Sequence, residues 1–331
     1  MTVADMFDQI PARPGGGSAA APARRQRPPR LCASRRPAYA GGDRGISEVC
    51  EVRDAMAGSG SADAPAGQAR PVVAVLGLGE AGSEIAAGLC AAGAVVRGFD
   101  PRVAAGPGVV ACADDAGASR GADIVLALTS AHDAEETLRL ALPGIRPGAL
   151  YAEMNTASAG LKASLGELAA GAGVSFADIA LMSPVPGNGL HTPMLASGPA
   201  AGPFADAFRR LGASVEVLPG PPGTAAARKL VRSVFYKGLA AAVIESLRAA
   251  EAAGCGDWIR DNIRRELASA SAGTLDRLEQ GSIRHARRRA DEMAAAGELL
   301  RELGIPPRVA GASEEWLQQL LAEQVSGGSP G

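Results

Sequence analysis

Short hydrophobic runs separated by helical stretches fill the middle of the chain. VVAVL (72–76) is apolar and rich in β-branched residues, as expected for a strand buried on both faces. A helix is expected over 81–92 and another over 203–211. The further strands are expected at VVRGF (95–99), IVLAL (124–128), ALYAEM (149–154), VSFADI (174–179), MLASG (194–198) and VEVL (215–218). This alternation predicts a mostly parallel, doubly wound α/β sheet.

The pattern becomes entirely helical after the break PGPPG (219–223). Thr224 is expected to N-cap a proline-free helix that continues to about Ala253 and stops at Gly254. Such a helix would span roughly 45 Å, so we expect it to run between domains or into a partner subunit. The remaining helices are expected over 257–269, 271–280, 282–303 and 313–325.

These patterns divide the chain into three parts. Residues 1–70 are rich in Pro, Gly, Ala and Arg without a sustained apolar period, which predicts disorder or an upstream-extended reading frame with Met56 as the start. Residues 71–220 form the predicted α/β domain. Residues 221–331 form the predicted all-α C-terminal domain.

Composition narrows the class of protein. Aromatic residues are only 3% of the chain, so the core must be built from small aliphatic side chains. A net charge of −2 argues against a nucleic-acid or membrane-surface partner, and no apolar run is as long as a membrane span. Five cysteines without a CxxC pair suit free thiols in the cytoplasm, and no cluster of His, Asp and Glu suggests a metal site.

A glycine-rich loop follows the first predicted strand. It fits GxGxxG, follows a buried strand and opens a helix, and an acidic residue ends the next strand. These are the conditions for a dinucleotide-binding, Rossmann-type domain, in which the diphosphate lies at the helix N-terminus. The loop residues are Gly77, Leu78, Gly79, Glu80, Ala81 and Gly82.

The acidic residue, Asp100, is expected to accept hydrogen bonds from the adenine-ribose hydroxyls and to repel a 2′-phosphate. Arg102 could neutralise such a phosphate, so NAD is favoured while NADP stays open. Two polar pairs end later strands, where such folds bind ligands: Thr129 with Ser130, and Asn155 with Thr156.

Lysine is rare in this chain. Only three of the 33 basic residues are lysines, and Lys229 and Lys237 share the long predicted helix. A desolvated lysine exchanges protons near neutrality, whereas arginine cannot be deprotonated in a protein. These two amines are therefore candidates for catalysis or substrate binding.

With these residues in view, residues 71–325 resemble the β-hydroxyacid dehydrogenase superfamily, which includes 6-phosphogluconate and 3-hydroxyisobutyrate dehydrogenases. The resemblance rests on the glycine loop, on MNT (154–156), on the segment from Asp178 to Gly198, and on the long helix. The all-helical end, with RHARRRADEM (284–293) before ELGIPP (302–307), resembles a branch with a phosphogluconate-dehydrogenase-like C-terminal domain.

The resemblance implies a role for the long helix. In the family this helix carries a lysine about six residues after a glycine, a glutamate sixteen beyond the lysine, and then a terminal glycine. Gly223, Lys229, Glu245 and Gly254 match that spacing, which selects Lys229 as the catalytic amine. Ser233 stands where the family has asparagine, one turn from Lys229, and could orient the amine or the substrate.

The family's Ser-Gly-Gly substrate loop is replaced here by Met182-Ser183-Pro184, and Pro184 has no N–H to offer a carboxylate. The substrate is therefore expected to be a small acidic molecule but not a standard one. Because His285 and Arg288 are three residues apart on one expected helix, they should share a face. The candidate substrate-binding residues are Ser183, Asn188, His191, Lys237, His285 and Arg288.

The resemblance implies an NAD(P)-dependent dehydrogenase or reductase that moves a hydride between nicotinamide and a small β-hydroxyacid or related alcohol or carbonyl. The expected assembly is a homodimer built on the long helix, as in the family. Two alternatives stay open: reduction of a C=N bond, as in the related imine reductases, and a non-catalytic dinucleotide-binding sensor or assembly protein.

Overall fold

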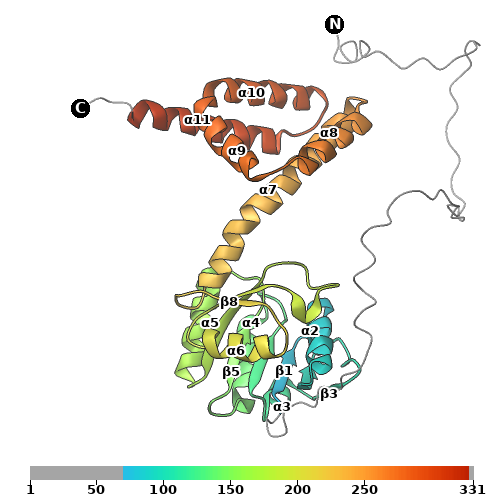
Figure 1. The fold of residues 1–331 in the computed structure, drawn as a ribbon, viewed down its shortest axis with the longest axis vertical. Helices are drawn as coiled ribbons and strands as arrows, with labels where there is room; N and C mark the ends of the chain where they lie inside the picture. Colours follow the sequence, from blue (N-terminus) through green and yellow to red (C-terminus); the bar gives the residue numbers. More distant parts are fainter. Residues whose placement is uncertain (1–69, 328–331) are drawn as a thin grey trace, which may run out of the picture. The chain divides into compact units, whose positions relative to one another are not determined.

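The computed structural model describes residues 70–327. The predicted N-terminal extension, including Met56, lies outside the described residues except for Arg70. The predicted fold class is confirmed: an eight-stranded sheet alternates with helices and is followed by helices only (Figure 1). The strands are β1 (Val72–Leu76), β2 (Val95–Phe99), β3 (Val109–Ala111), β4 (Ile124–Ala127), β5 (Leu150–Glu153), β6 (Ser175–Leu181), β7 (Met194–Ser197) and β8 (Val215–Val217).

The sheet has the order β3-β2-β1-β4-β5-β6-β7-β8. All described neighbours are parallel except β6 and β7, which pair antiparallel with Ile179 opposite Ala196. From β1 the chain first adds β2 and β3 on one side of the sheet, and then β4 to β8 on the other side. A crevice therefore forms at the carboxyl ends of β1 and β4, where folds of this kind bind ligands.

Helices cover both faces of the sheet. They are α2 (Glu80–Ala91), α3 (Asp115–Ser119), α4 (Ala134–Ala141), α5 (Ala159–Gly171) and α6 (Ala201–Arg210), with the 3-10 turns η1 (Leu142–Gly144) and η2 (Gly189–His191). The two faces of the sheet carry two separate apolar clusters, each built mainly from Ala, Val, Leu and Ile. The low aromatic content thus gives the small-residue core that was expected.

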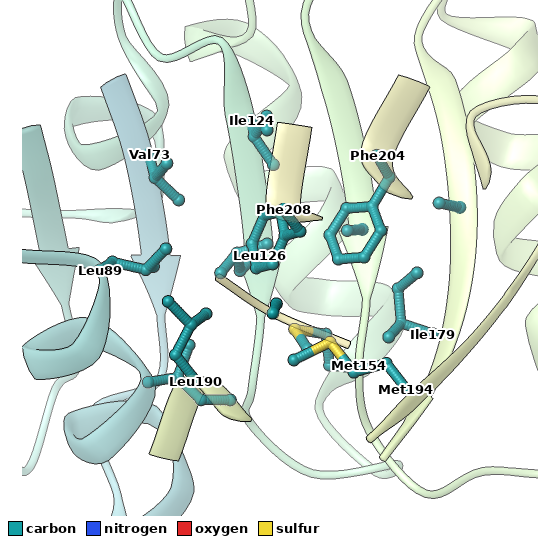
Figure 2. Packing of buried hydrophobic residues seen from close by; sticks show 14 of the residues in the cluster. Val73, Leu89, Ile124, Leu126, Met154, Ile179, Leu190, Met194, Phe204 and Phe208 are labelled. Carbon is teal, nitrogen blue, oxygen red and sulfur yellow. The ribbon is translucent and has the colours of Figure 1, made fainter. Parts of the chain in front are cut away.

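The larger cluster fills the space between α2, α6 and the sheet. Phe204 and Phe208 of α6 stack with ring centroids 4.1 Å apart, and they pack with Leu126 of β4 and Ile179 of β6 (Figure 2). Leu190 from η2 belongs to the same cluster. Leu190 packs so closely on α2 that a Cβ added to Gly88 would lie 2.8 Å from the Leu190 Cβ.

The all-helical part begins with α7 (Thr224–Ala252), which is about 44 Å long at 1.5 Å per residue. It continues through α8 (Gly256–Ala268), α9 (Ala272–Arg284), α10 (Ala286–Glu302) and α11 (Arg308–Gly327). The prediction that Thr224 caps α7 is wrong: Gly223 is the N-cap, and the Thr224 hydroxyl donates to the Pro221 carbonyl. Gly223 has φ 101°, a conformation that a side chain on that residue would strain.

Three further predictions needed correction. The strand β3 was missed because it has only three residues, two of them exposed. The helix expected over 282–303 is broken at His285, which ends α9 and precedes α10. The last helix begins at Arg308, five residues before its predicted start.

Candidate active site

A cavity of about 1000 Å³ lies at the carboxyl ends of β1, β2 and β4. Six of the residues predicted to bind a cofactor line it: Gly77, Gly79, Asp100, Arg102, Thr129 and Ser130. The sequence interpretation missed four carboxylates that also line it: Asp114, Asp115, Asp133 and Glu136. All four lie at or near the start of α3 or α4. Acidic residues there stabilise a helix whether or not a ligand binds, so their positions in the sequence did not indicate a ligand site.

The three glycines of the loop have different surroundings. Gly77 has φ 92°, and a Cβ there would lie 2.4 Å from the Leu128 carbonyl oxygen. A Cβ on Gly82 would lie 1.9 Å from the Gly77 carbonyl oxygen, so α2 packs directly on the loop. A Cβ on Gly79 would meet no described atom within 4 Å, and its φ of −62° suits any residue. Gly79 leaves open space at the cavity wall, as a closely approaching diphosphate would need.

Asp100 joins the glycine loop to the end of β2 by hydrogen bonds. One carboxylate oxygen accepts the Leu78 N–H at 2.8 Å, and the other accepts the N–H groups of Arg102 and Val103 at 2.8 and 3.0 Å. Partial burial raises the pKa of Asp100, but these three backbone donors and the Arg102 charge outweigh it and hold the pKa below its usual value. Asp100 therefore stays ionised and fixed in place at the cavity rim.

A short chain of hydrogen bonds leads from the cavity to the next strand end. The Asn155 side-chain N–H donates to the Thr129 hydroxyl at 3.2 Å, so the two predicted polar pairs are in contact. Asn155 is 8% exposed and lies just after β5. Thr156 follows it and is exposed.

Lys229 meets this strand end. Its amine donates to the Thr156 hydroxyl at 2.7 Å, across 73 positions of sequence. Burial lowers the pKa of the Lys229 amine first of all, and the positive charges of Lys162, Lys237 and Arg232 lower it further.

The other two candidates on α7 are arranged differently. The Ser233 hydroxyl donates to the Lys229 backbone carbonyl at 2.9 Å, a contact within the helix that leaves its oxygen only as an acceptor for an amine or substrate. Lys237 is exposed and contributes to lowering the pKa of Lys229, so the two amines are electrostatically coupled.

The loop after β6 holds three candidates for substrate binding. The Ser183 hydroxyl oxygen is buried and has no hydrogen-bond partner among the described residues. Asn188 donates its side-chain N–H to the Pro184 carbonyl at 2.9 Å, and a ring nitrogen of His191 lies 3.2 Å from the Gly212 carbonyl. Asn188 and His191 thus hold the loop together, while Ser183 has an unused donor and acceptor.

His285 and Arg288 do not share a helix face, because α9 ends at His285 and α10 begins at the next residue. Arg288 forms an exposed i,i+4 ion pair with Glu292. The helix α10 packs on α11, whose first N–H groups are bonded to Glu245. Glu245 lies about 24 Å along α7 from Lys229, so the structure does not bring His285 and Arg288 to Lys229 of the same chain.

The matched family position Glu245 has a structural contact of its own. Its carboxylate accepts the backbone N–H groups of Arg308, Val309 and Ala310 at 2.8–3.1 Å. These are the first N–H groups of α11, which a helix leaves without internal partners. Glu245 therefore caps α11 from α7 and joins the two helices.

The main feature that the sequence interpretation missed is a buried ion cluster beside this site. Lys162 of α5 is fully buried and is paired with Glu153 of β5 and with Asp178 of β6, the latter at 3.1 Å. The three side chains are 0% exposed. The cluster could have been predicted, because Glu153 and Asp178 lie in strands that were expected to be buried, and buried carboxylates require a cationic partner.

The described residues contain no group of three or more His, Cys, Asp or Glu side chains able to hold a metal ion. Over the same range, no helix combines the length and the apolar character that a membrane span requires.

The sheet, the glycine loop and the cavity at the switch in strand order define a dinucleotide-binding α/β fold with a helical C-terminal part. The model of a family described as a domain of unknown function (DUF1932) matches residues 250–320. No functionally curated protein matches the sequence.

Solved structures resemble nearly the whole described chain. A conserved hypothetical protein from Sinorhizobium meliloti 1021 is 28% identical, with 76% of this chain and 88% of that one covered and a TM-score of 0.51. An imine reductase from Myxococcus stipitatus in complex with NADP+ is 18% identical, with 78% and 95% covered and a TM-score of 0.65. A reductive aminase from Aspergillus terreus is 17% identical, with 77% and 95% covered and a TM-score of 0.63. The α/β fold with a helical C-terminal part, which was expected from the resemblance to the β-hydroxyacid dehydrogenase superfamily, is thereby confirmed as a fold.

Proposed function

We propose that the protein is an NAD-dependent oxidoreductase that transfers a hydride between nicotinamide and the hydroxyl-bearing carbon of a small acidic substrate. A β-hydroxyacid or a related alcohol or carbonyl compound is the substrate class. The observation that carries the proposal is the contact between the Lys229 amine and the Thr156 hydroxyl, one strand away from the glycine-loop cavity.

The residues around the cavity fit a dinucleotide. Gly79 leaves room for a diphosphate next to the N-terminus of α2, where backbone N–H groups and the helix dipole favour anions. Asp100 is ionised and lines the cavity, where it would accept hydrogen bonds from ribose hydroxyls. The bound cofactor would supply the nicotinamide carbon that gives or takes the hydride. The solved imine reductase and reductive aminase are described with NADP+ and NADPH4, which supports a nicotinamide cofactor in this fold.

The preference for NAD over NADP rests on charge. Asp100 and the four other carboxylates of the cavity face a single nearby cation, Arg102. Like charges at short range are unfavourable, so a 2′-phosphate would bind poorly there. NAD lacks that phosphate and is the better fit.

Lys229 would carry the proton. In the oxidative direction its neutral amine accepts the hydroxyl proton while the substrate carbon loses a hydride and becomes a carbonyl. In the reductive direction its ammonium donates to the carbonyl oxygen. A free lysine is a poor base near neutrality, and burial together with the charges of Lys162, Lys237 and Arg232 lowers the pKa of Lys229 toward the useful range.

The start of α7 suits an acidic substrate. Residues 224–244 contain Arg228, Lys229, Arg232 and Lys237 and no acidic residue. A carboxylate near Lys229 would meet these cations, and the Ser183 hydroxyl, which has no partner among the described residues, is a candidate to bind it.

Reduction of a C=N bond is the alternative reaction. The solved structures with the highest TM-scores given above are an imine reductase and a reductive aminase, which favours this reading at the level of fold. Lys229 favours the hydroxyacid reaction, because the resemblance to the β-hydroxyacid dehydrogenase superfamily selects it as the catalytic amine. A non-catalytic dinucleotide-binding sensor would need the glycine loop but not Lys229.

The experiment has two stages. NADH and NADPH are first titrated against the purified full-length protein by cofactor fluorescence. A panel of small keto acids, hydroxyacids and cyclic imines is then assayed by the change in reduced-cofactor absorbance. Turnover of an acid supports the proposal, turnover of imines alone supports the alternative, and tight cofactor binding without any turnover supports the sensor.

We also propose that two copies associate through α7. The helix has 29 residues, of which only Ala225, Ala226 and Ala250 are buried among the described residues. Val231, Val234 and Phe235 share one face and are 73%, 75% and 58% exposed. A second copy of α7 would cover this face with an equivalent apolar surface. Light scattering should give a dimer, and Val234→Glu with Phe235→Glu should give a monomer; a monomeric parent protein would contradict the proposal.

A further inference from the structure

The buried cation Lys162 holds two carboxylates together under the candidate site. Its amine pairs with Glu153 Oε2 and with Asp178 Oδ1, and it donates to the Glu153 carbonyl at 2.8 Å. Those two carboxylate oxygens have no other partner among the described residues. Without the amine, two like charges would face each other out of water.

Asp178 uses its second oxygen to hold the start of α7. Asp178 Oδ2 accepts the N–H groups of Gly223 and Ala226 at 3.0 and 3.1 Å and the Ser197 hydroxyl at 3.1 Å. Ser197 in turn accepts the Ala225 N–H at 3.0 Å. The sheet thus supplies the cap that α7 lacks in its own sequence, because the helix N-cap residue is Gly223.

Glu153 uses its second oxygen to hold the segment that follows its own strand, β5. Glu153 Oε1 accepts the Asn155 backbone N–H at 3.1 Å, and Thr156 is the next residue. The two segments anchored by these carboxylates therefore meet again at the hydrogen bond between Lys229 and Thr156.

We propose that Lys162 is a positioning residue: by pairing with Glu153 and Asp178 it fixes the start of α7 against the end of β5 and so sets the environment of the Lys229 amine. A catalytic consequence rests on the proposed function, but the positioning itself does not. If Lys162 is removed, one of the two carboxylates takes up a proton, and the Asp178 cap on α7 weakens. The Lys162 charge and one carboxylate charge are lost together, so the net buried charge is unchanged. Lys229 gains solvent, however, and this raises its pKa.

The charged groups that act on Lys229 are known from the structure. Lys162 belongs to α5, while Arg232 and Lys237 belong to α7 itself. Burial of Lys229 is the larger influence on its pKa. Removal of Lys162 should therefore change the Lys229 titration mainly through the burial of the Lys229 amine.

The test uses the scarcity of lysine. The full-length chain has three lysines, so selective ¹³C labelling of lysine gives three side-chain signals, which single substitutions assign. The Lys229 signal is titrated without cofactor in the parent protein, in Lys162→Met and in the control Arg139→Met, which removes an exposed ion pair with Glu135. We expect the Lys229 midpoint to rise in Lys162→Met and to stay unchanged in the control.

A role in overall stability alone would lower the melting temperature of Lys162→Met and leave the Lys229 midpoint of the folded protein unchanged; that result overturns the proposal. If Lys162→Met does not fold, the double variant Lys162→Met with Glu153→Gln takes its place. In the parent protein, one buried amine and two buried carboxylates have a net charge of −1. The double variant keeps only the Asp178 carboxylate, so its net buried charge is the same. A raised Lys229 midpoint in the double variant supports the proposal, and an unchanged midpoint or a failure to fold overturns it.

NADH binding separates this outcome from the proposed function. The glycine loop lies after β1, whereas the cluster lies on α5, β5 and β6. A raised Lys229 midpoint in a protein that binds no NADH would refute the proposed function and leave the positioning role standing.

Discussion

The Lys229 amine donates a hydrogen bond of 2.7 Å to the hydroxyl of Thr156, which lies 73 positions earlier in the chain. The contact joins the first helix of the all-helical part to the carboxyl edge of the sheet. An amine held there is partly removed from water and lies one strand from the cavity formed by the glycine loop.

Replacing Lys229 with methionine should lower turnover by about 10²–10⁴-fold, the range for loss of a general acid or base. NADH affinity should stay the same because the glycine loop is untouched. Lys229→Arg keeps the charge but cannot release a proton near neutrality, so it should be impaired as well. Steady-state kinetics and fluorescence titration measure the two effects, and full activity of either variant would contradict the role of Lys229.

Oxidation and reduction should respond to pH in opposite ways. The pKa of Lys229 lies below 10.5. As pH rises, half of the Lys229 amines are therefore neutral before pH 10.5 is reached. Oxidative kcat/KM should rise with pH with a midpoint below pH 10.5, while reductive kcat/KM should fall around the same midpoint. A midpoint at or above 10.5 in both directions would show that another group carries the proton.

Two glycines of one loop should respond differently to alanine. Gly82→Ala places a methyl group 1.9 Å from the Gly77 carbonyl oxygen, so a loss of about 1–3 kcal/mol in unfolding free energy is expected. Gly79→Ala meets no described atom and should change stability by less than about 0.5 kcal/mol. It should nonetheless weaken NADH binding about tenfold or more. Thermal unfolding and NADH titration distinguish the pair, and unchanged NADH affinity of Gly79→Ala would argue against a diphosphate at this wall.

NADH should bind more tightly than NADPH, because five carboxylates line the cavity beside a single arginine. The difference should shrink at high salt, since added ions screen the repulsion of a 2′-phosphate. Arg102→Ala should weaken NADPH more than NADH. Tighter binding of NADPH at low salt would contradict the charge argument.

Glu245→Ala should destabilise the packing of α11 on α7 by about 0.5–2 kcal/mol, the usual range for a helix cap. Partial burial raises the pKa of Glu245, but the N–H groups of Val309, Ala310 and Arg308 outweigh this and lower it below 4.5. The cap therefore contributes stability above pH 4.5 and loses it as pH falls through the lower folded value. Glu251→Ala on the same helix, which removes only a long ion pair with Arg260, is the matched control and should change stability by less than about 0.5 kcal/mol. Equal effects of the two substitutions would contradict the cap.

The elements that could be predicted from the sequence are those whose conformation depends on neighbouring residues. The apolar run 72–76, the glycine loop and Asp100 lie close together in the chain, and each has a conformation that its own residues favour. The strand β3 was missed because three residues with two exposed give no period to detect. The break at His285 was missed because the basic run around it reads as one continuous helix.

Lys162 illustrates the harder case. The rarity of lysine drew attention to Lys229 and Lys237 on one helix, and the sequence interpretation gave Lys162 no role. Its two partners lie nine positions before it and sixteen positions after it, on different strands. Only the pairing of β5 with β6 and the packing of α5 bring the three charges together.

The sequence by itself determined the alternating sheet, the glycine turn and the long proline-free helix, because turn geometry, periodicity and helix propensity act over a few neighbouring residues. Only the tertiary structure decided that Glu153, Lys162 and Asp178 are one buried cluster, that Asp178 caps α7, and that Lys229 meets Thr156. These contacts depend on how strands and helices far apart in the chain pack, and the energy of a buried charge depends on which partners that packing provides.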